Sequence, residues 1–196
     1  MIIIPIGTDC GSAELTKKYN LRHASFPLDW IVSYAGMSKM IQTDFANFIP
    51  EGTGGRLTNS EYKTWLLHYD LPNDTDKIKR RVERVMDLLK NSKEEIVFLR
   101  RGHWKTHHNE YEQHFPNVDS SDMDDIAEAE NLCRVIEEKY PDLLFSVVVI
   151  LTCDRCYDAS KTYTPAFPNI KIYNIAMDRG NNDVVEQVFV QHFCNK

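Results

Sequence analysis

The feature that most constrains the fold is the alternation of short apolar segments with helical patterns. Four segments are bounded by polar or turn residues and carry β-branched or aromatic side chains, namely residues 2–7, 95–100, 144–151 and 171–176. Such segments are typical of buried strands, although the last alternates with polar residues and is a weaker example. Apolar residues recur every three or four positions in 78–89 and 126–140, as in helices packed on one side. Strand–helix alternation predicts parallel strands covered by helices.

We therefore expect an α/β fold with three layers, in which a mostly parallel sheet is flanked by helices, similar to flavodoxin or the SGNH hydrolases. The chain has 196 residues, a length that fits one domain. No internal repeat or linker divides it, so we predict a single domain over residues 1–196. The stretch 45–74 is rich in glycine and proline around a short apolar piece, and we expect a loop-rich insertion there.

Composition narrows the function classes. The chain has 29 acidic and 23 basic residues, a net charge of -6, which argues against nucleic-acid binding because that needs a basic face. The longest mostly apolar stretch, 143–153, is far shorter than the about 20 residues of a membrane span. Residues 2–4 follow Met1 without a basic region, unlike a secretory signal. Five cysteines are an odd and small number for a chain of this length, unlike the cysteine content of a secreted disulfide scaffold. We therefore expect free thiols and a cytoplasmic location.

Cys10 is the strongest candidate for chemistry. It follows the first predicted strand in the run Gly7-Thr8-Asp9-Cys10-Gly11-Ser12 and precedes a predicted helix. Ligands of open α/β sheets bind at the carboxyl ends of the strands, and a helix amino terminus favours a thiolate. Glycines at positions 7 and 11 would permit a tight turn and a close approach of substrate. The alternative is that Cys10 is a small buried hydrophobic residue, as most free cysteines are.

A second run strengthens this hypothesis. Gly7-x-x-Cys10 with Ala13 and Leu15 is followed by Leu21-Arg22 and by Pro27-Leu28-Asp29-Trp30. Together these residues resemble the opening signature of the putative papain-like cysteine peptidases, a domain family of otherwise unknown function. His68-Tyr69-Asp70-Leu71 and the segments 80–84 and 96–100 are similar to later parts of that family, so the resemblance extends over about 2–101.

The resemblance implies a thiol hydrolase in which Cys10 is the nucleophile, His68 its base and an acid orients the imidazole. Asp29 is preferred as that acid, and Asp70 is the alternative. An imidazole that takes the thiol proton provides a nucleophilic sulfur, and the N–H of Cys10 or Gly11 would stabilise the oxyanion. A histidine of the 103–114 loop, His103 or His108, is the reserve candidate for the base.

Four further residues are expected to line the substrate site: Asp9, Arg22, Trp30 and Arg100. With Gly11 they complete the predicted binding set. A guanidinium near the strand ends would hold an anionic group, or pair with Asp29 as part of the structure. Trp30 has packing as its simpler explanation.

Other motifs give weaker signals. The histidines and carboxylates of 103–114 lack the framework of a metal site, and a polar loop is the commoner explanation. Cys153-Asp154-Arg155-Cys156 has redox spacing without the thioredoxin context. The acidic residues of 119–125 suit a helix's first turn better than a calcium loop. We predict no metal and no cofactor.

The sequence thus predicts a cysteine-dependent hydrolase or acyl transferase acting on a peptide, isopeptide or other acyl group. The main alternative is a non-catalytic flavodoxin-like module that binds a small ligand or a protein. A redox role of Cys153 and Cys156 is the third hypothesis. The sequence does not indicate an oligomeric state.

Overall fold

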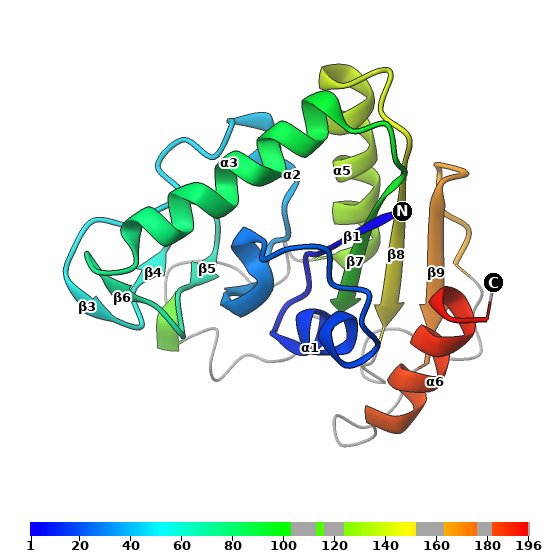
Figure 1. Cartoon of the computed structure of the whole chain (residues 1–196), viewed down its shortest axis with the longest axis horizontal. Coiled ribbons are helices and arrows are strands. Elements are labelled where there is room, and N and C mark those ends of the chain that lie inside the picture. The colour runs from blue at the N-terminus through cyan, green and yellow to red at the C-terminus, as the bar shows by residue number, and fades with distance from the viewer. Residues whose placement is uncertain (103–112, 116–123, 152–162, 176–181, 196) are drawn as a thin grey trace.

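A computed structural model describes residues 1–102, 113–115, 124–151, 163–175 and 182–195. Its main sheet contains four parallel strands in the order β1 (Ile2–Pro5), β7 (Ile96–Gly102), β8 (Phe145–Leu151) and β9 (Ile170–Asn174). These are the four predicted strands, with ends shifted by a few residues. Ile2 pairs with Ile96, Ile96 with Phe145, and Val147 with Ile170, so the four strands lie side by side in Figure 1.

Helices cover both faces of this sheet. One apolar cluster joins Ile4 and Phe98 to α3 (Thr75–Asn91) and α5 (Asp125–Lys139). A second cluster joins the alternate strand residues, among them Leu99, to α1 (Gly11–Lys18) and α6 (Asn182–Phe193). Successive strand side chains point to opposite faces, so a strand that is apolar throughout needs a helix on each face. The predicted three-layer α/β fold is confirmed.

The helix boundaries follow the sequence signals. Asp124 caps α5, since its Oδ1 accepts hydrogen bonds from the amides of Ile126 and Ala127 at 2.9 and 3.1 Å. In α3 the residues spaced for one face, Ile78, Val85 and Leu89, are buried.

Short elements fill the chain between α1 and α3. They are the 3-10 helix η1 (Pro27–Trp30), β2 (Val32–Ser33), α2 (Ser38–Gln42), β3 (Gly54–Gly55), β4 (Thr58–Asn59), β5 (Thr64–Trp65) and β6 (Asp70–Leu71). The strands form two small antiparallel sheets, β2-β5-β4 and β3-β6. Four of them, β3 to β6, lie in the stretch predicted as an insertion, at the end of the molecule away from β9 and α6 (Figure 1).

Two further properties bear on the predicted fold. In the flavodoxin order the first strand lies inside the sheet, whereas among the described strands β1 lies at an edge. None of the described helices is both long and apolar enough to span a membrane.

Candidate functional site

Cys10 lies where the sequence predicts it, between β1 and α1. The amide of Thr8 still bonds to the Arg101 carbonyl at 3.3 Å, so the chain follows β7 almost to the cysteine. Cys10 is then the N-cap of α1, and its carbonyl accepts the amide of Glu14 at 2.9 Å. The thiol is half-buried at the carboxyl edge of the sheet. This position allows a ligand to reach the sulfur.

His68 lies beside Cys10 in the folded chain, although the two residues are 58 positions apart in the sequence. Its Nε2 lies 3.6 Å from the Cys10 Sγ. Leu66 and Tyr69 on either side are buried, and Arg81 of α3 donates a hydrogen bond to the Tyr69 hydroxyl. These neighbours fix the loop between β5 and β6, and the His68 ring is left exposed over the thiol. The two predicted reaction partners are therefore within hydrogen-bonding reach.

The electrostatics of Cys10 differ from the expectation. Partial burial raises the pKa of the Cys10 thiol, and the carboxylates of Asp9 and Glu14 raise it further. Desolvation and nearby negative charge both disfavour a thiolate, so they act against the stabilisation expected from the helix terminus. The thiol is protonated at neutral pH, so a base must remove its proton before the sulfur can attack.

The Asp9 side chain bonds to one of the two backbone amides that were predicted to stabilise an oxyanion. Its Oδ1 accepts the N–H of Gly11 at 2.8 Å, which closes the turn that starts α1. That N–H is therefore engaged by a carboxylate, which leaves the N–H of Cys10 as the other predicted donor. Asp9 thus shapes the turn around the thiol.

Asp29, the acid predicted to orient the imidazole, bonds elsewhere. Its Oδ2 pairs with Arg22 Nη2 at 2.5 Å and accepts the Phe26 amide at 3.0 Å, which holds the η1 turn closed. The side chain is fully buried, and burial raises the pKa of Asp29 against the opposing effect of Arg22. Asp70 is exposed and accepts from Asn73 at 2.9 Å. In the described part of the chain neither carboxylate bonds to His68, so the role of Asp29 as a catalytic acid stays a prediction.

Trp30 is the predicted binding residue that does lie beside the pair. Its ring meets the His68 ring edge to face, with centroids 6.1 Å apart and an interplanar angle of 86°. The Arg22 guanidinium lies over the Trp30 ring, 5.8 Å from its centroid. Trp30 therefore contacts His68 directly, and Arg22 contacts Trp30.

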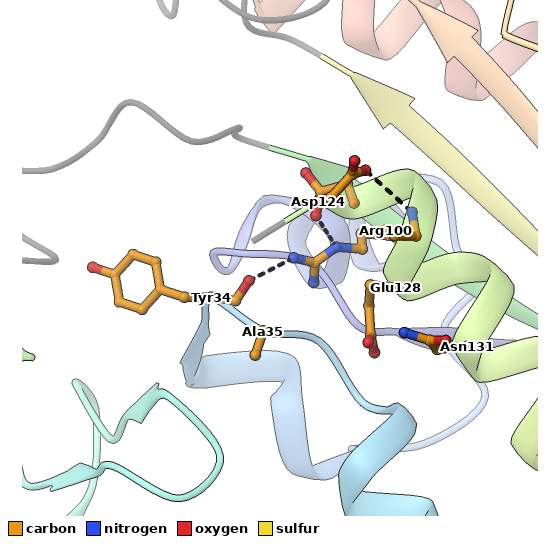
Figure 2. Close-up of a pocket in the computed structure, with 8 residues that line it drawn as sticks. Tyr34, Ala35, Arg100, Asp124, Glu128 and Asn131 are labelled. Carbon is orange, nitrogen blue, oxygen red and sulfur yellow. Dashed lines mark hydrogen bonds and ion pairs between the residues drawn. The ribbon is translucent and has the colours of Figure 1, made fainter. Parts of the chain in front are cut away.

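Arg100 has a structural position. Its Nε donates to Asp125, its Nη1 to the Ile6 carbonyl at 2.9 Å and its Nη2 to the Tyr34 carbonyl at 3.0 Å. The side chain is 1% exposed. Figure 2 shows it at a polar cavity of about 140 Å³ beside the start of α5, which neither Cys10 nor His68 lines. Of the two predicted alternatives, these contacts favour the structural ion pair, although its partner is Asp125 and not Asp29.

Arg101 is the residue that sequence analysis overlooked. A Cβ built on Gly11 would lie 2.4 Å from Arg101 Nη1, so the guanidinium lies directly against the start of α1. Strand alternation could have found it, since Arg101 shares its face with Leu99, on the α1 side, and Arg100 faces α5. The lack of a side chain on Gly11 makes room for it.

Arg101 also lines a groove between α1 and α6. The groove has a volume of about 210 Å³ and is lined by Gly11, Glu14, Leu15, Lys18, Arg101, Val185 and Glu186. Lys18 and Glu186 pair across it at 2.6 Å. Of the predicted binding residues, Gly11 lines this groove; Asp9, Arg22, Trp30 and Arg100 do not.

Several candidates fall outside the described residues, namely His103, His107, His108, Cys153 and Cys156. His114 is described, and its ring stacks on Trp65 with centroids 4.0 Å apart. No group of three or more potential metal ligands occurs in the described ranges. Cys10, Cys133 and Cys194 carry free thiols.

Fold and site define an α/β protein with a thiol–imidazole pair at the carboxyl edge of its parallel sheet. Residues 1–54 match the model of a family described as putative papain-like cysteine peptidase. The matched range contains Cys10, Arg22, Asp29 and Trp30 and confirms the resemblance there, whereas His68 lies beyond it. No curated protein and no solved structure matches the chain.

Proposed function

We propose that this protein is a cysteine-dependent hydrolase or acyl transferase that attacks a peptide, isopeptide or other acyl carbonyl. The observation that carries the proposal is the 3.6 Å approach of His68 Nε2 to Cys10 Sγ, between residues far apart in the chain. A nucleophile and a base within hydrogen-bonding reach are the signature of covalent catalysis. The family match at residues 1–54 supports the same class.

The chemistry follows from these two residues. His68 Nε2 takes the Cys10 proton as the sulfur forms a bond to the carbonyl carbon, and the carbonyl π electrons move to oxygen. The Cys10 N–H would donate to that oxyanion. Collapse of the intermediate breaks the bond to the leaving group, which takes the proton from His68, and leaves a thioester. Water, or an acceptor nucleophile, then gives a proton to His68 and attacks the thioester carbon. The carbon–sulfur bond breaks, the acyl product leaves, and the sulfur takes the proton from His68 to restore the thiol.

An activated ester tests this mechanism without knowledge of the natural substrate. Incubation with p-nitrophenyl acetate should release p-nitrophenol and acetylate Cys10, as seen by intact-protein mass spectrometry and peptide mapping. Cys10→Ala should abolish the rapid phase, and His68→Gln should slow it about 100-fold at neutral pH because the base is lost. Cys194→Ala removes an exposed thiol just after the end of α6 and should behave as the unmodified chain. Equal acetylation of Cys10→Ala and the unmodified chain would refute the proposal.

One observation favours the alternative, a module that binds a ligand or partner without catalysis. The raised pKa of Cys10 makes it a weak nucleophile unless His68 assists it. In that case Cys10 and Cys194 would be acetylated at similar slow rates, and His68→Gln would change neither. Binding would then be sought at the α1–α6 groove.

A further inference from the structure

The His68 ring needs a fixed orientation if Nε2 is to meet the thiol, yet no described carboxylate bonds to it. In most nucleophile–base pairs a third group holds the base. Among the described residues, the ring makes a hydrogen-bond contact with the Cys10 sulfur at 3.6 Å and an aromatic contact with the Trp30 ring at 6.1 Å between centroids. Trp30 is therefore the side chain that can hold the imidazole against rotation.

Trp30 is itself held by a buried ion pair. The Arg22 guanidinium lies over the indole, and its Nη2 bonds to Asp29 Oδ2 at 2.5 Å and to Ser25 Oγ at 3.0 Å. Asp29 is fully buried and also accepts the Phe26 amide, one residue before η1. Since η1 ends at Trp30, the same carboxylate fixes both the backbone that carries the indole and the cation above it.

We propose that Trp30 is a positioning residue for His68, and that Asp29 acts on the imidazole through Arg22 and Trp30 instead of by direct contact. This inference rests on the proposed function, because it requires His68 to be the base. An edge-to-face aromatic contact has a preferred geometry, so it can select one ring orientation. A planar guanidinium stacks on an indole in a way that an ammonium does not reproduce. An aromatic ring in edge-to-face contact thus takes the place of the predicted triad acid beside the imidazole.

The test measures alkylation of Cys10 by iodoacetamide as a function of pH, with peptide mapping to separate the thiols. In the unmodified chain Cys10 should react at pH values below the ionisation of an isolated thiol, because His68 takes its proton. Trp30→Leu should lower the neutral rate about tenfold and shift the profile to alkaline pH, because a base that is out of place transfers protons poorly. Trp30→Phe should retain most of the neutral alkylation rate of the unmodified chain. Arg22→Lys should lower that rate by less than Trp30→Leu does.

Matched controls separate positioning from folding. Trp65→Leu removes the same side chain from a position that stacks on His114, and Arg84→Lys alters an arginine that bonds to the Ser25 carbonyl without stacking on Trp30. Both should leave the pH profile unchanged, and thermal unfolding should report any loss of stability in every variant. A structural role of Trp30 would lower the melting temperature without moving the pH profile.

The outcomes distinguish the two proposals. If His68→Gln shifts the profile and Trp30→Leu does not, His68 remains the base and the positioning role is refuted. If His68→Gln has no effect, the base assignment fails and the positioning role fails with it. A shift in both, with recovery in Trp30→Phe, supports the inference.

Discussion

At the scale of single residues, environment decides the chemistry of otherwise identical thiols. Cys133 is fully buried in α5, and burial raises its pKa to about 12. Cys194 is exposed, and Cys10 lies between these extremes with an imidazole beside it. Because the thiolate is the reactive species, burial protects Cys133 and proximity to His68 distinguishes Cys10.

The buried Cys133 thiol makes a predictable contribution to the pH dependence of stability. Its pKa in the folded chain, about 12, lies above that of an unfolded thiol, so the unfolded chain loses the proton first as pH rises. The stabilising contribution is complete below about pH 8.5 and is lost progressively toward pH 12. Cys133→Val should therefore lose less stability between about pH 9 and pH 11 than the unmodified chain, measured by urea denaturation at each pH. Identical slopes for the two chains would contradict this account.

At the scale of elements, α2 shows a helix that depends on a neighbour. Five residues are too few for an independently stable helix. Glu128 of α5 accepts the amides of Met37 and Ser38 at 2.7 and 2.8 Å at its amino end. Lys139, also from α5, donates to the Ile41 carbonyl at 2.8 Å at the other end. One helix thus supplies an anion and a cation to the matching ends of another.

Gly36 makes the approach of Glu128 possible. Its φ is +89°, and a Cβ there would lie 2.4 Å from Glu128 Oε1. Gly36→Ala should lower the free energy of unfolding by about 2–3 kcal/mol, from backbone strain and the displaced carboxylate together. Gly54→Ala is the matched control, with φ of +102° but no atom within 4 Å of the new methyl. Urea denaturation should show a larger loss for Gly36→Ala, and equal losses would exclude a role for the collision.

At the scale of the whole molecule, Arg100 connects segments that are distant in the chain. From the end of β7 its guanidinium reaches the Ile6 carbonyl after β1, the Tyr34 carbonyl after β2 and Asp125 at the start of α5. The Ile6 carbonyl belongs to the same connection that leads to Cys10. The Arg100–Asp125 ion pair and these two carbonyl hydrogen bonds therefore stabilise the edge of the sheet where Cys10 lies.

Removal of this arginine should destabilise the whole fold. Arg100→Met removes the guanidinium that pairs with the buried Asp125 carboxylate, which should cost about 3–5 kcal/mol of unfolding free energy. Adding Asp125→Leu to Arg100→Met should recover part of the loss, because the buried carboxylate is then absent as well. Calorimetry of the Arg100→Met and Asp125→Leu single variants and of the double variant provides the measurement. A double variant as unstable as the sum of the two single variants would show that the pair is not energetically coupled.

The three-layer α/β architecture, the four parallel strands and the position of Cys10 were predictable from the amino-acid sequence, because strand and helix periodicities and the turn before α1 are local properties. A resemblance, and not spacing, identified His68. The folded chain was needed to show that His68 lies beside Cys10, that Asp29 bonds to Arg22, and that Arg101 and not Arg100 lies against α1. Those contacts join residues as distant in the chain as Cys10 and His68 or Gly11 and Arg101, or depend on which face of a strand a side chain occupies. The raised pKa of Cys10 has the same origin, since its largest cause, desolvation by burial, arises only when the chain is folded.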